Sequence, residues 1–457
     1  MQRIIIYVLI SLILAVGYMI KEKRICNPIT IICGLWSVIM FLSSLELFTL
    51  YHTSPTSYDC IFLGVISFVF GYHLIFLISA GRIECIKFHI PKKIYFDSEY
   101  DLNYRRSYFF AALCIVMLSY SFFRYRAVIV RSGFSLSAIQ AYLYSEESRI
   151  HQLSGILNAI SFLVSAPMMI VIEVTTAVEI WGGKGNKKLV IMCILIVLGR
   201  IITSGGRQAV IQFMLFNIIA FSCSSINLRK RISHFMWDVS KKNIKRQKKK
   251  FLWILGVLSV VILITTLSRT KNLWRHLYPD FAMQPYMFEH WANEVNSKKL
   301  RGNGLASWIG FSYSLFYIIK NLFRISMPDI ILSTYQMTER VISEWVMIGS
   351  TLRANAYVSI FWYFYYDARV FGIFIGMFIL GWISHHVYYY AINYPSKINI
   401  AMYAMIGTLL FYSYGDLEIA KPAFALAILY VRFFLYKRRK VGSIRFDLSK
   451  NRKESEI

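Results

Sequence analysis

Apolar residues run almost unbroken through most of this chain, and polar and basic residues gather between the runs. The runs are roughly 17 to 25 residues long, the length that an α-helix needs to cross about 30 Å of hydrocarbon. They lie near residues 4–20, 29–49, 58–80, 107–123, 153–180, 189–204, 206–226, 251–268, 371–391, 400–415 and 417–436. The pattern predicts an all-α, polytopic integral membrane protein with about eleven transmembrane helices.

Composition supports this prediction. Hydrophobic residues make up 57% of the 457 residues and charged residues only 16%, whereas a water-soluble chain typically carries about 25% charged residues. The chain is therefore predicted to have most of its surface in lipid rather than in water.

Basic residues collect in alternate connections between the apolar runs. Residues 21–28, 81–106, 181–188, 229–250, 392–399 and 437–457 hold 31 of the 51 Lys and Arg residues. Because such residues resist translocation, these segments are predicted to face the cytoplasm and the N-terminus to lie outside. KEKR follows the first run in place of a cleavage site, so this run is expected to remain as an anchor. The basic segment 228–250 fits topology and anionic lipid better than nucleic acid.

The long stretch 269–370 interrupts the succession of apolar runs. It is rich in aromatic residues and contains the amphipathic sequence ASWIGFSYSLFYIIKNLFRI, which can lie along the outer leaflet. We therefore expect four regions: transmembrane helices 1–8 in 1–268, a large periplasmic loop or cap in 269–370, helices 9–11 in 371–436, and a basic cytoplasmic tail in 437–457.

Several kinds of chemistry are not expected from this sequence. The seven cysteines fall in or beside apolar runs and none lies in 269–370, which argues against a disulfide-stapled outer domain. No GxxxxGK[ST], HExxH or CxxC pattern occurs, so no nucleotide, metal or other cofactor is predicted. Glu173 and Glu179 lie within an apolar run, where a structural ion pair with Arg200 and a proton relay both stay open.

The sequence ITSGGRQAVIQFML suggests a site for an anion. Arg207 stands at the start of a predicted helix, whose free N–H groups and dipole favour negative charge. Gly205 and Gly206 would let the backbone approach that anion closely. In the alternative interpretations, Arg207 extends to the membrane surface or caps the preceding helix.

More arginines are expected at the same face. Arg269 and Arg275 follow the eighth predicted helix in LSRTKNLWRH, and Arg353 lies in STLRANAY. A guanidinium group can bind pyrophosphate through two parallel hydrogen bonds. Together with the SGGR turn, these residues predict a site for a lipid pyrophosphate.

SGGRQAVIQF, the long aromatic loop, LRANAY and YYDARVFGIFIGMFILG in a polytopic frame resemble the O-antigen polymerase family, the oligosaccharide repeat-unit polymerases of bacterial envelopes. The resemblance implies a membrane-embedded glycosyltransferase in the bacterial inner membrane, with its active site facing the periplasm. Its donor and acceptor would be undecaprenyl pyrophosphate-linked oligosaccharides among membrane lipids, without nucleotide sugar or metal. It further implies a chain-length regulator as a partner protein.

This reaction requires cations for the leaving group and a base for the acceptor hydroxyl. Arg207, Arg269 and Arg353 are the predicted cations, with Arg275 in reserve. The candidate bases are Asp280, Glu289, Glu339, Glu344, Asp367, His276 and His290, of which Glu344 and Asp367 are favoured because they flank Arg353. The predicted sugar contacts are Trp274, Tyr278, Asn355, Tyr357 and Tyr365.

Two other functions remain open at this stage. A lipid-linked glycan ligase would have a similar frame and use the same arginines with a different acceptor. A transporter or flippase of lipid-linked oligosaccharide would place charges along a central cavity between short loops. The large outer loop, and the absence of a recognisable internal inverted repeat in the sequence, favour an enzyme over a transporter.

Overall fold

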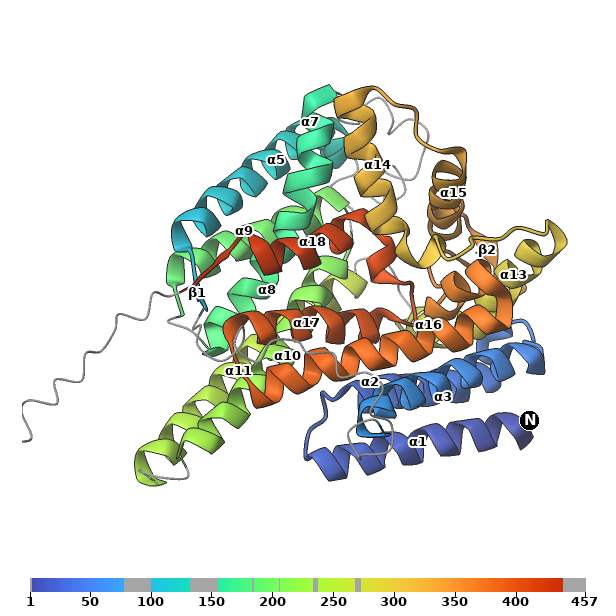
Figure 1. The fold of residues 1–457 in the computed structure, drawn as a ribbon, viewed down its shortest axis with the longest axis horizontal. Coiled ribbons are helices and arrows are strands. Elements are labelled where there is room, and N and C mark those ends of the chain that lie inside the picture. Colours follow the sequence, from blue (N-terminus) through green and yellow to red (C-terminus); the bar gives the residue numbers. More distant parts are fainter. Residues whose placement is uncertain are drawn as a thin grey trace, which may run out of the picture.

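The computed structural model describes residues 2–77, 100–131, 155–182, 185–204, 206–232, 237–267 and 273–438. These residues are mainly helical, with two short antiparallel strand pairs. In Figure 1 the helices α1, α2, α3, α16 and α17 lie side by side along one direction. The predicted all-α class is confirmed.

The helices that correspond to the apolar runs are α1 (Gln2–Glu22), α2 (Pro28–Ser44), α3 (Pro55–Leu77), α5 (Tyr104–Arg131), α7 (Gly155–Ile160) continuing through η5 (Ser161–Ser165) into α8 (Ala166–Gly182), α9 (Lys187–Ser204), α10 (Gln208–Ile232), α11 (Trp237–Leu267), α16 (Ile360–Asn393), α17 (Lys397–Tyr412) and α18 (Pro422–Phe433). Between α11 and α16 lie α12 (Leu273–Ala282), α13 (Gln284–Ser297), η6 (Ala306–Trp308), α14 (Ile309–Phe323), α15 (Asp329–Ser343), β2 (Val346–Met347) and β3 (Arg353–Ala354).

Five helical segments among the described residues are long and apolar enough to cross a membrane. They are Gln2–Glu22, Pro55–Leu74, Tyr104–Arg124, Gly155–Gly182 and Ile360–Asn393. Every predicted run overlaps a helix, but several of these helices are shorter, and α18 has only 12 residues, or about 18 Å of helix. The helices thus have the character of a membrane protein, and the number of eleven spans stays a prediction.

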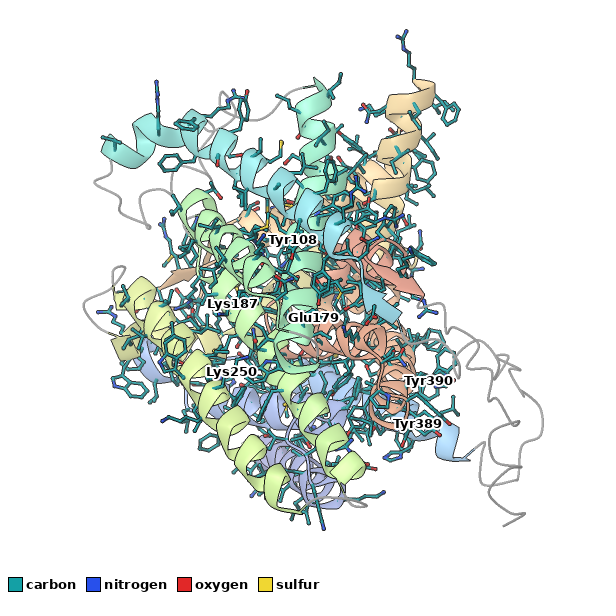
Figure 2. The ribbon with its side chains drawn as sticks, turned by 90° about the vertical axis from the view of Figure 1, so that its left-hand side faces the viewer. Tyr108, Glu179, Lys187, Lys250, Tyr389 and Tyr390 are labelled. Carbon is teal, nitrogen blue, oxygen red and sulfur yellow. The ribbon has the colours of Figure 1, made fainter. Side chains whose placement is uncertain are left out.

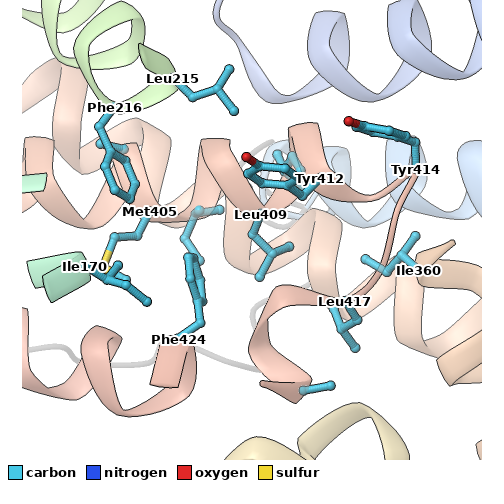
Figure 3. Close-up of a cluster of buried hydrophobic side chains, with 14 of the residues drawn as sticks. Ile170, Leu215, Phe216, Ile360, Met405, Leu409, Tyr412, Tyr414, Leu417 and Phe424 are labelled. Atoms are coloured by element: carbon cyan, nitrogen blue, oxygen red, sulfur yellow. The ribbon is translucent and has the colours of Figure 1, made fainter. Parts of the chain in front are cut away.

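The helices pack largely through apolar side chains. α16 packs along α3, α1 along α2, α5 along α9, and α8 against α10 and α18. Figure 3 shows Ile170, Phe216, Met405 and Phe424 meeting where α8, α10, α17 and α18 converge. Helices that are apolar all round bury part of their surface against neighbours and leave the rest to lipid.

α16 differs from its prediction in where it begins and in its continuity. It begins at Ile360, inside the stretch assigned to the outer loop. Ala368 and Arg369 have non-helical backbone angles, and Arg369 has a φ of 60°. Gly372 permits this break, because a Cβ there would collide with the carbonyl oxygen of Phe364. The helix is therefore two segments that meet at a sharp kink.

The region between α11 and α16 forms a helical cap at one end of the bundle, where the N-terminus also lies (Figure 1). α14 crosses the direction of the long helices in this view. It coincides with the predicted amphipathic sequence and leaves Leu315, Leu322 and Phe323 exposed. This arrangement suits a helix lying at the edge of a membrane.

The opposite end of the bundle is tied together by β1 (Tyr100–Leu102) and β4 (Tyr436–Arg438), which pair antiparallel. Figure 2 looks onto this end and labels Glu179 on α8. The Glu179 carboxylate accepts a hydrogen bond from the Tyr104 hydroxyl at 2.7 Å and pairs with Lys397 at 2.8 Å. Glu173 forms the ion pair with Arg200. Of the two carboxylates in this apolar run, Glu173 therefore pairs with Arg200 as predicted, whereas Glu179 pairs with Lys397.

Candidate functional site

Arg207 lies between α9 and α10 and connects three helices. Its Nη1 donates a hydrogen bond to Thr266 Oγ1 on α11 at 3.0 Å, and its Nη2 pairs with the Asp280 carboxylate on α12. Its side chain is 21% exposed. Burial opposes the charge of the guanidinium, but Asp280 and Tyr357 outweigh it and raise the pKa of Arg207. The predicted anion-binding residue is therefore charged and already paired with an anionic side chain.

Two segments far apart in sequence bring Tyr357 close to Arg207. The Ser359 N–H donates to the Gly415 carbonyl at 3.1 Å, and the Ile360 N–H donates to the Ser413 carbonyl at 2.8 Å. The rings of Tyr357 and Tyr414 lie 5.9 Å apart. The start of α16 and the end of α17 are thus held together beside the guanidinium.

Lys421, just before α18, is the second cation at this place. Its Nζ lies 2.7 Å from Asp416 Oδ2 and 2.8 Å from Glu418 Oε1. Gln208 Nε2 donates to Glu418 Oε1 at 3.2 Å, which joins this ion pair network to the residue beside Arg207. We refer to the following residues as the Arg207–Lys421 cluster: Arg207, Gln208, Asp280, Tyr357, Asp416, Glu418 and Lys421.

The cluster contains three carboxylates and two cations. Burial raises the pKa of Asp416 to about 7, although Lys421 opposes this shift. Asp416 Oδ1 is buried and has no hydrogen-bond partner among the described residues. Asp416 can therefore take up or release a proton near neutral pH, and it has an oxygen atom available for a hydroxyl donor.

Two other candidate bases lie in or near the cluster. Asp280 belongs to it through Arg207. Glu339, on α15, has its pKa raised by burial, while the charge of Lys421 opposes that shift. Of the candidate bases predicted from sequence, these two are the ones that the structure associates with the cluster's cations.

The remaining candidate bases have other surroundings. The Glu289 carboxylate accepts hydrogen bonds from the Ser54 N–H at 2.7 Å and the Ser57 hydroxyl at 3.1 Å, at the start of α3. Burial lowers the pKa of His290, so its ring is neutral at pH 7. The His276 side chain lies outside the described residues.

The two favoured acids do not flank one common site. Asp367 accepts hydrogen bonds from the backbone N–H groups of Ala306 at 2.8 Å and Ser307 at 3.0 Å, and so caps η6. Glu344 is exposed and accepts a hydrogen bond from Arg340 Nε at 2.6 Å. Arg340 also pairs with Glu294 at 2.6 Å, so Glu344 belongs to a surface ion pair network.

The other predicted cations lie apart from the cluster or outside the described residues. Arg353, on β3, is exposed and contacts the Met347 sulfur at 3.1 Å. Arg275 donates to the Thr351 hydroxyl at 3.2 Å. The Gly206 N–H donates to the Ser204 hydroxyl at 3.1 Å. Gly205 and Arg269 lie outside the described residues.

Of the predicted sugar contacts, Tyr357 is in the cluster. Tyr278 donates to the Leu42 carbonyl at 2.6 Å and so ties α12 to α2. Trp274 is 76% exposed. Tyr365 shares a hydrogen bond with Asn296 at 2.9 Å, and Asn355 donates to the Ser343 carbonyl at 3.5 Å.

Sequence reasoning missed Asp416, Glu418 and Lys421. They lie in YGDLEIAKP, where the predicted runs 400–415 and 417–436 meet, and three charged residues within six positions interrupt an otherwise apolar region there. That interruption was the available signal, since charges between closely spaced membrane helices are costly unless they have partners or a function.

No protein-family model, curated protein or solved structure matches this chain.

Proposed function

We propose that this protein is a membrane-embedded glycosyltransferase of the O-antigen polymerase type. It would lie in the bacterial inner membrane with eleven spans, the N-terminus and the cap facing the periplasm. It would transfer a glycan from one undecaprenyl pyrophosphate carrier to a second lipid-linked repeat unit. The observation that carries the proposal is the Arg207–Lys421 cluster, a partly buried group of cations and carboxylates where the bundle meets the cap.

Arg207 would bind the pyrophosphate of the donor. In the transition state the bond between the anomeric carbon and the pyrophosphate oxygen breaks, and the electron pair leaves with the pyrophosphate. A positioned guanidinium stabilises that growing charge best where water is excluded. In this structure Arg207 is paired with Asp280. Pyrophosphate would therefore have to displace the Asp280 carboxylate in order to bind Arg207.

Asp416 would accept the proton of the acceptor hydroxyl. As the hydroxyl oxygen forms its bond to the anomeric carbon, the proton passes to Asp416 Oδ1, which has no other partner among the described residues. Its pKa of about 7 suits a group that must be deprotonated before reaction and protonated after it. Lys421 and Glu418 would hold the carboxylate in place.

The test uses purified protein with synthetic undecaprenyl pyrophosphate-linked repeat units, without nucleotide sugar or added metal. We expect a ladder of lengthening glycans, and a loss of about 100- to 1,000-fold in rate for Arg207→Ala, the usual cost of removing a transition-state charge contact. Arg324→Ala, at an exposed arginine after α14, is the matched control and should retain the wild-type rate.

Other outcomes would favour the alternative functions. Folded wild-type protein that forms no ladder but transfers one glycan to a different acceptor would support a ligase. Movement of the lipid-linked glycan across vesicles without any new glycosidic bond would support a transporter. A ladder that is unchanged in Arg207→Ala would support the polymerase function but show that Arg207 takes no part in the reaction.

A further inference from the structure

A groove runs along the second segment of α16, on the other side of the loop that carries Asp416. Its volume is about 660 Å³. Its walls are apolar and are formed mainly by Ile375, Ile379 and Ile383 of α16, Ile406 and Leu409 of α17, and Leu417. Ile379 is 41% exposed and the neighbouring Phe371 66% exposed. The groove therefore opens along a helix face that is suited to contact lipid.

One end of the groove is cationic. Arg301 and Arg369 lie there together with Asn303 and Ser307. Arg301 is exposed and, within the described part of the chain, has no hydrogen bond or ion pair. Arg369 donates from Nη2 to the carbonyls of Leu300 at 2.8 Å and Val295 at 3.1 Å. Its Nη1 is buried and has no partner among the described residues.

Asp367 is the carboxylate that lines this end, and its oxygens are already engaged. One accepts the Ala306 N–H and the other the Ser307 N–H, at the cap of η6. It forms no ion pair with either arginine within the described residues. Neither guanidinium group is therefore bound in a direct ion pair in the part of the chain that the structure describes, and Asp367 is the one carboxylate among the residues that line the groove.

The break in α16 lies at this cationic end. Arg369 has a φ of 60°, a conformation that costs an arginine on the order of 1–3 kcal/mol. Irregular backbone within a membrane helix is tolerated where it lines a cavity. The N–H groups that begin the second segment of α16 add positive partial charge beside the two arginines. A cavity with a polar ligand at this end would explain the position of the break.

We infer that this groove binds one single-chain lipid with a terminal phosphate or pyrophosphate group. The hydrocarbon chain would lie between α16 and α17, and the phosphate oxygens would contact Arg301 and Arg369. Two guanidinium groups can donate to several oxygens of one terminal phosphate, which has more free oxygens and more charge than the phosphodiester of a phospholipid. The inference does not require that the protein be a glycosyltransferase.

The groove is distinct from the Arg207–Lys421 cluster. Leu417 and Ile419 line the groove, whereas their neighbours Asp416 and Glu418 bind Lys421. The loop between α17 and α18 is therefore the wall between an apolar lipid site and a polar cluster. If the protein is also a glycosyltransferase, the groove would place one lipid carrier beside that cluster. This placement of a carrier rests on the proposed function.

Native mass spectrometry of the full chain in detergent tests the inference, with undecaprenyl phosphate as the probe and phosphatidylglycerol as competitor. We expect one tightly bound undecaprenyl phosphate that phosphatidylglycerol does not displace at equal concentration. Arg301→Ala should weaken binding by about 10- to 100-fold, the range for one hydrogen bond to a charged group. Ile379→Trp should fill the groove and weaken binding by at least about tenfold through overpacking.

Two variants serve as matched controls. Arg324→Ala removes an exposed arginine outside the groove, and Ile194→Trp adds bulk to an exposed residue of α9. Both should bind the probe within about twofold of wild type, as surface substitutions usually do. Arg369→Ala is a less suitable test variant than Arg301→Ala, because it also removes the hydrogen bonds to the Leu300 and Val295 carbonyls.

Equal affinity of Arg301→Ala, Ile379→Trp and wild type for undecaprenyl phosphate would overturn the inference. Displacement of the probe by equimolar phosphatidylglycerol would also overturn it, since the groove would then hold ordinary membrane lipid. A failed polymerisation assay with intact probe binding would count against the proposed function alone. The two proposals can thus fail separately.

Discussion

The Arg207–Lys421 cluster and the cationic end of the groove both place two cations beside a membrane helix, but they treat charge in opposite ways. In the cluster, Arg207 pairs with Asp280, and Lys421 pairs with Asp416 and Glu418. In the groove, Arg301 has no ion pair within the described residues and Arg369 bonds to backbone carbonyls. Cations that have partners hold helices together, whereas cations without anionic partners at a cavity indicate a ligand that is brought from outside.

The largest expected effect comes from removing the cation between two buried carboxylates. Lys421→Met leaves Asp416 and Glu418 without their ion pairs, and breaking a buried pair in this way typically costs about 3–5 kcal/mol. We expect a corresponding loss in the free energy of unfolding, measured by thermal or denaturant unfolding in detergent. The exposed Lys320→Met on α14 is the control and should stay within about 0.5 kcal/mol of wild type.

A second substitution tests the break in α16. Gly372→Ala would press a Cβ against the Phe364 carbonyl oxygen, and overpacking of this kind costs roughly 1–3 kcal/mol. Undecaprenyl phosphate binding should fall along with stability, because the kink forms one end of the groove. Gly256→Ala is the control, since a Cβ there meets no atom within 4 Å. Equal stability of both variants would show that the kink is not held by close packing.

A third prediction concerns the pH dependence of stability. It tests the Arg207–Lys421 cluster, where the pKa of Asp416 is raised. The folded pKa of Asp416 is about 7, above the value of about 3.9 for an unfolded Asp. Between these values the folded state binds more protons than the unfolded state, so stability should fall as pH rises from about 4 to about 7. Asp416→Asn should lack this part of the pH dependence in unfolding measurements. An unchanged pH profile in the variant would refute the assignment to Asp416.

The smallest effect is expected for a substitution of Glu344. The sequence alone favoured this residue as a general base because it lies near Arg353. Its exposed pair with Arg340 is of a type worth about 0–1 kcal/mol. Glu344→Gln should therefore change stability by less than about 1 kcal/mol, and the rate of glycan polymerisation should remain close to that of wild type. A rate loss comparable to that of Arg207→Ala would restore Glu344 as a candidate for the reaction.

The helices could be predicted because long apolar runs have few other structures available in a membrane. Arg207 could be singled out because two glycines and a helix start give a local signal. Its partner Asp280 and the residues Asp416 and Lys421 could not be joined to it, since only tertiary packing brings these distant segments of the chain together. The break at Arg369 was also missed, because no proline marks it and Gly372 acts through a contact with Phe364.

The loop between α17 and α18 also limits how this protein can change during evolution. Alternate residues in this loop belong to two different sites. Asp416 and Glu418 contact Lys421, whereas Leu417 and Ile419 line the groove. Deleting a single residue ahead of Asp416 would tend to exchange these two faces, placing carboxylates on the lipid side and leucine and isoleucine against a lysine. Side chains in this loop can vary in kind, but a one-residue change in its length would damage both sites at once.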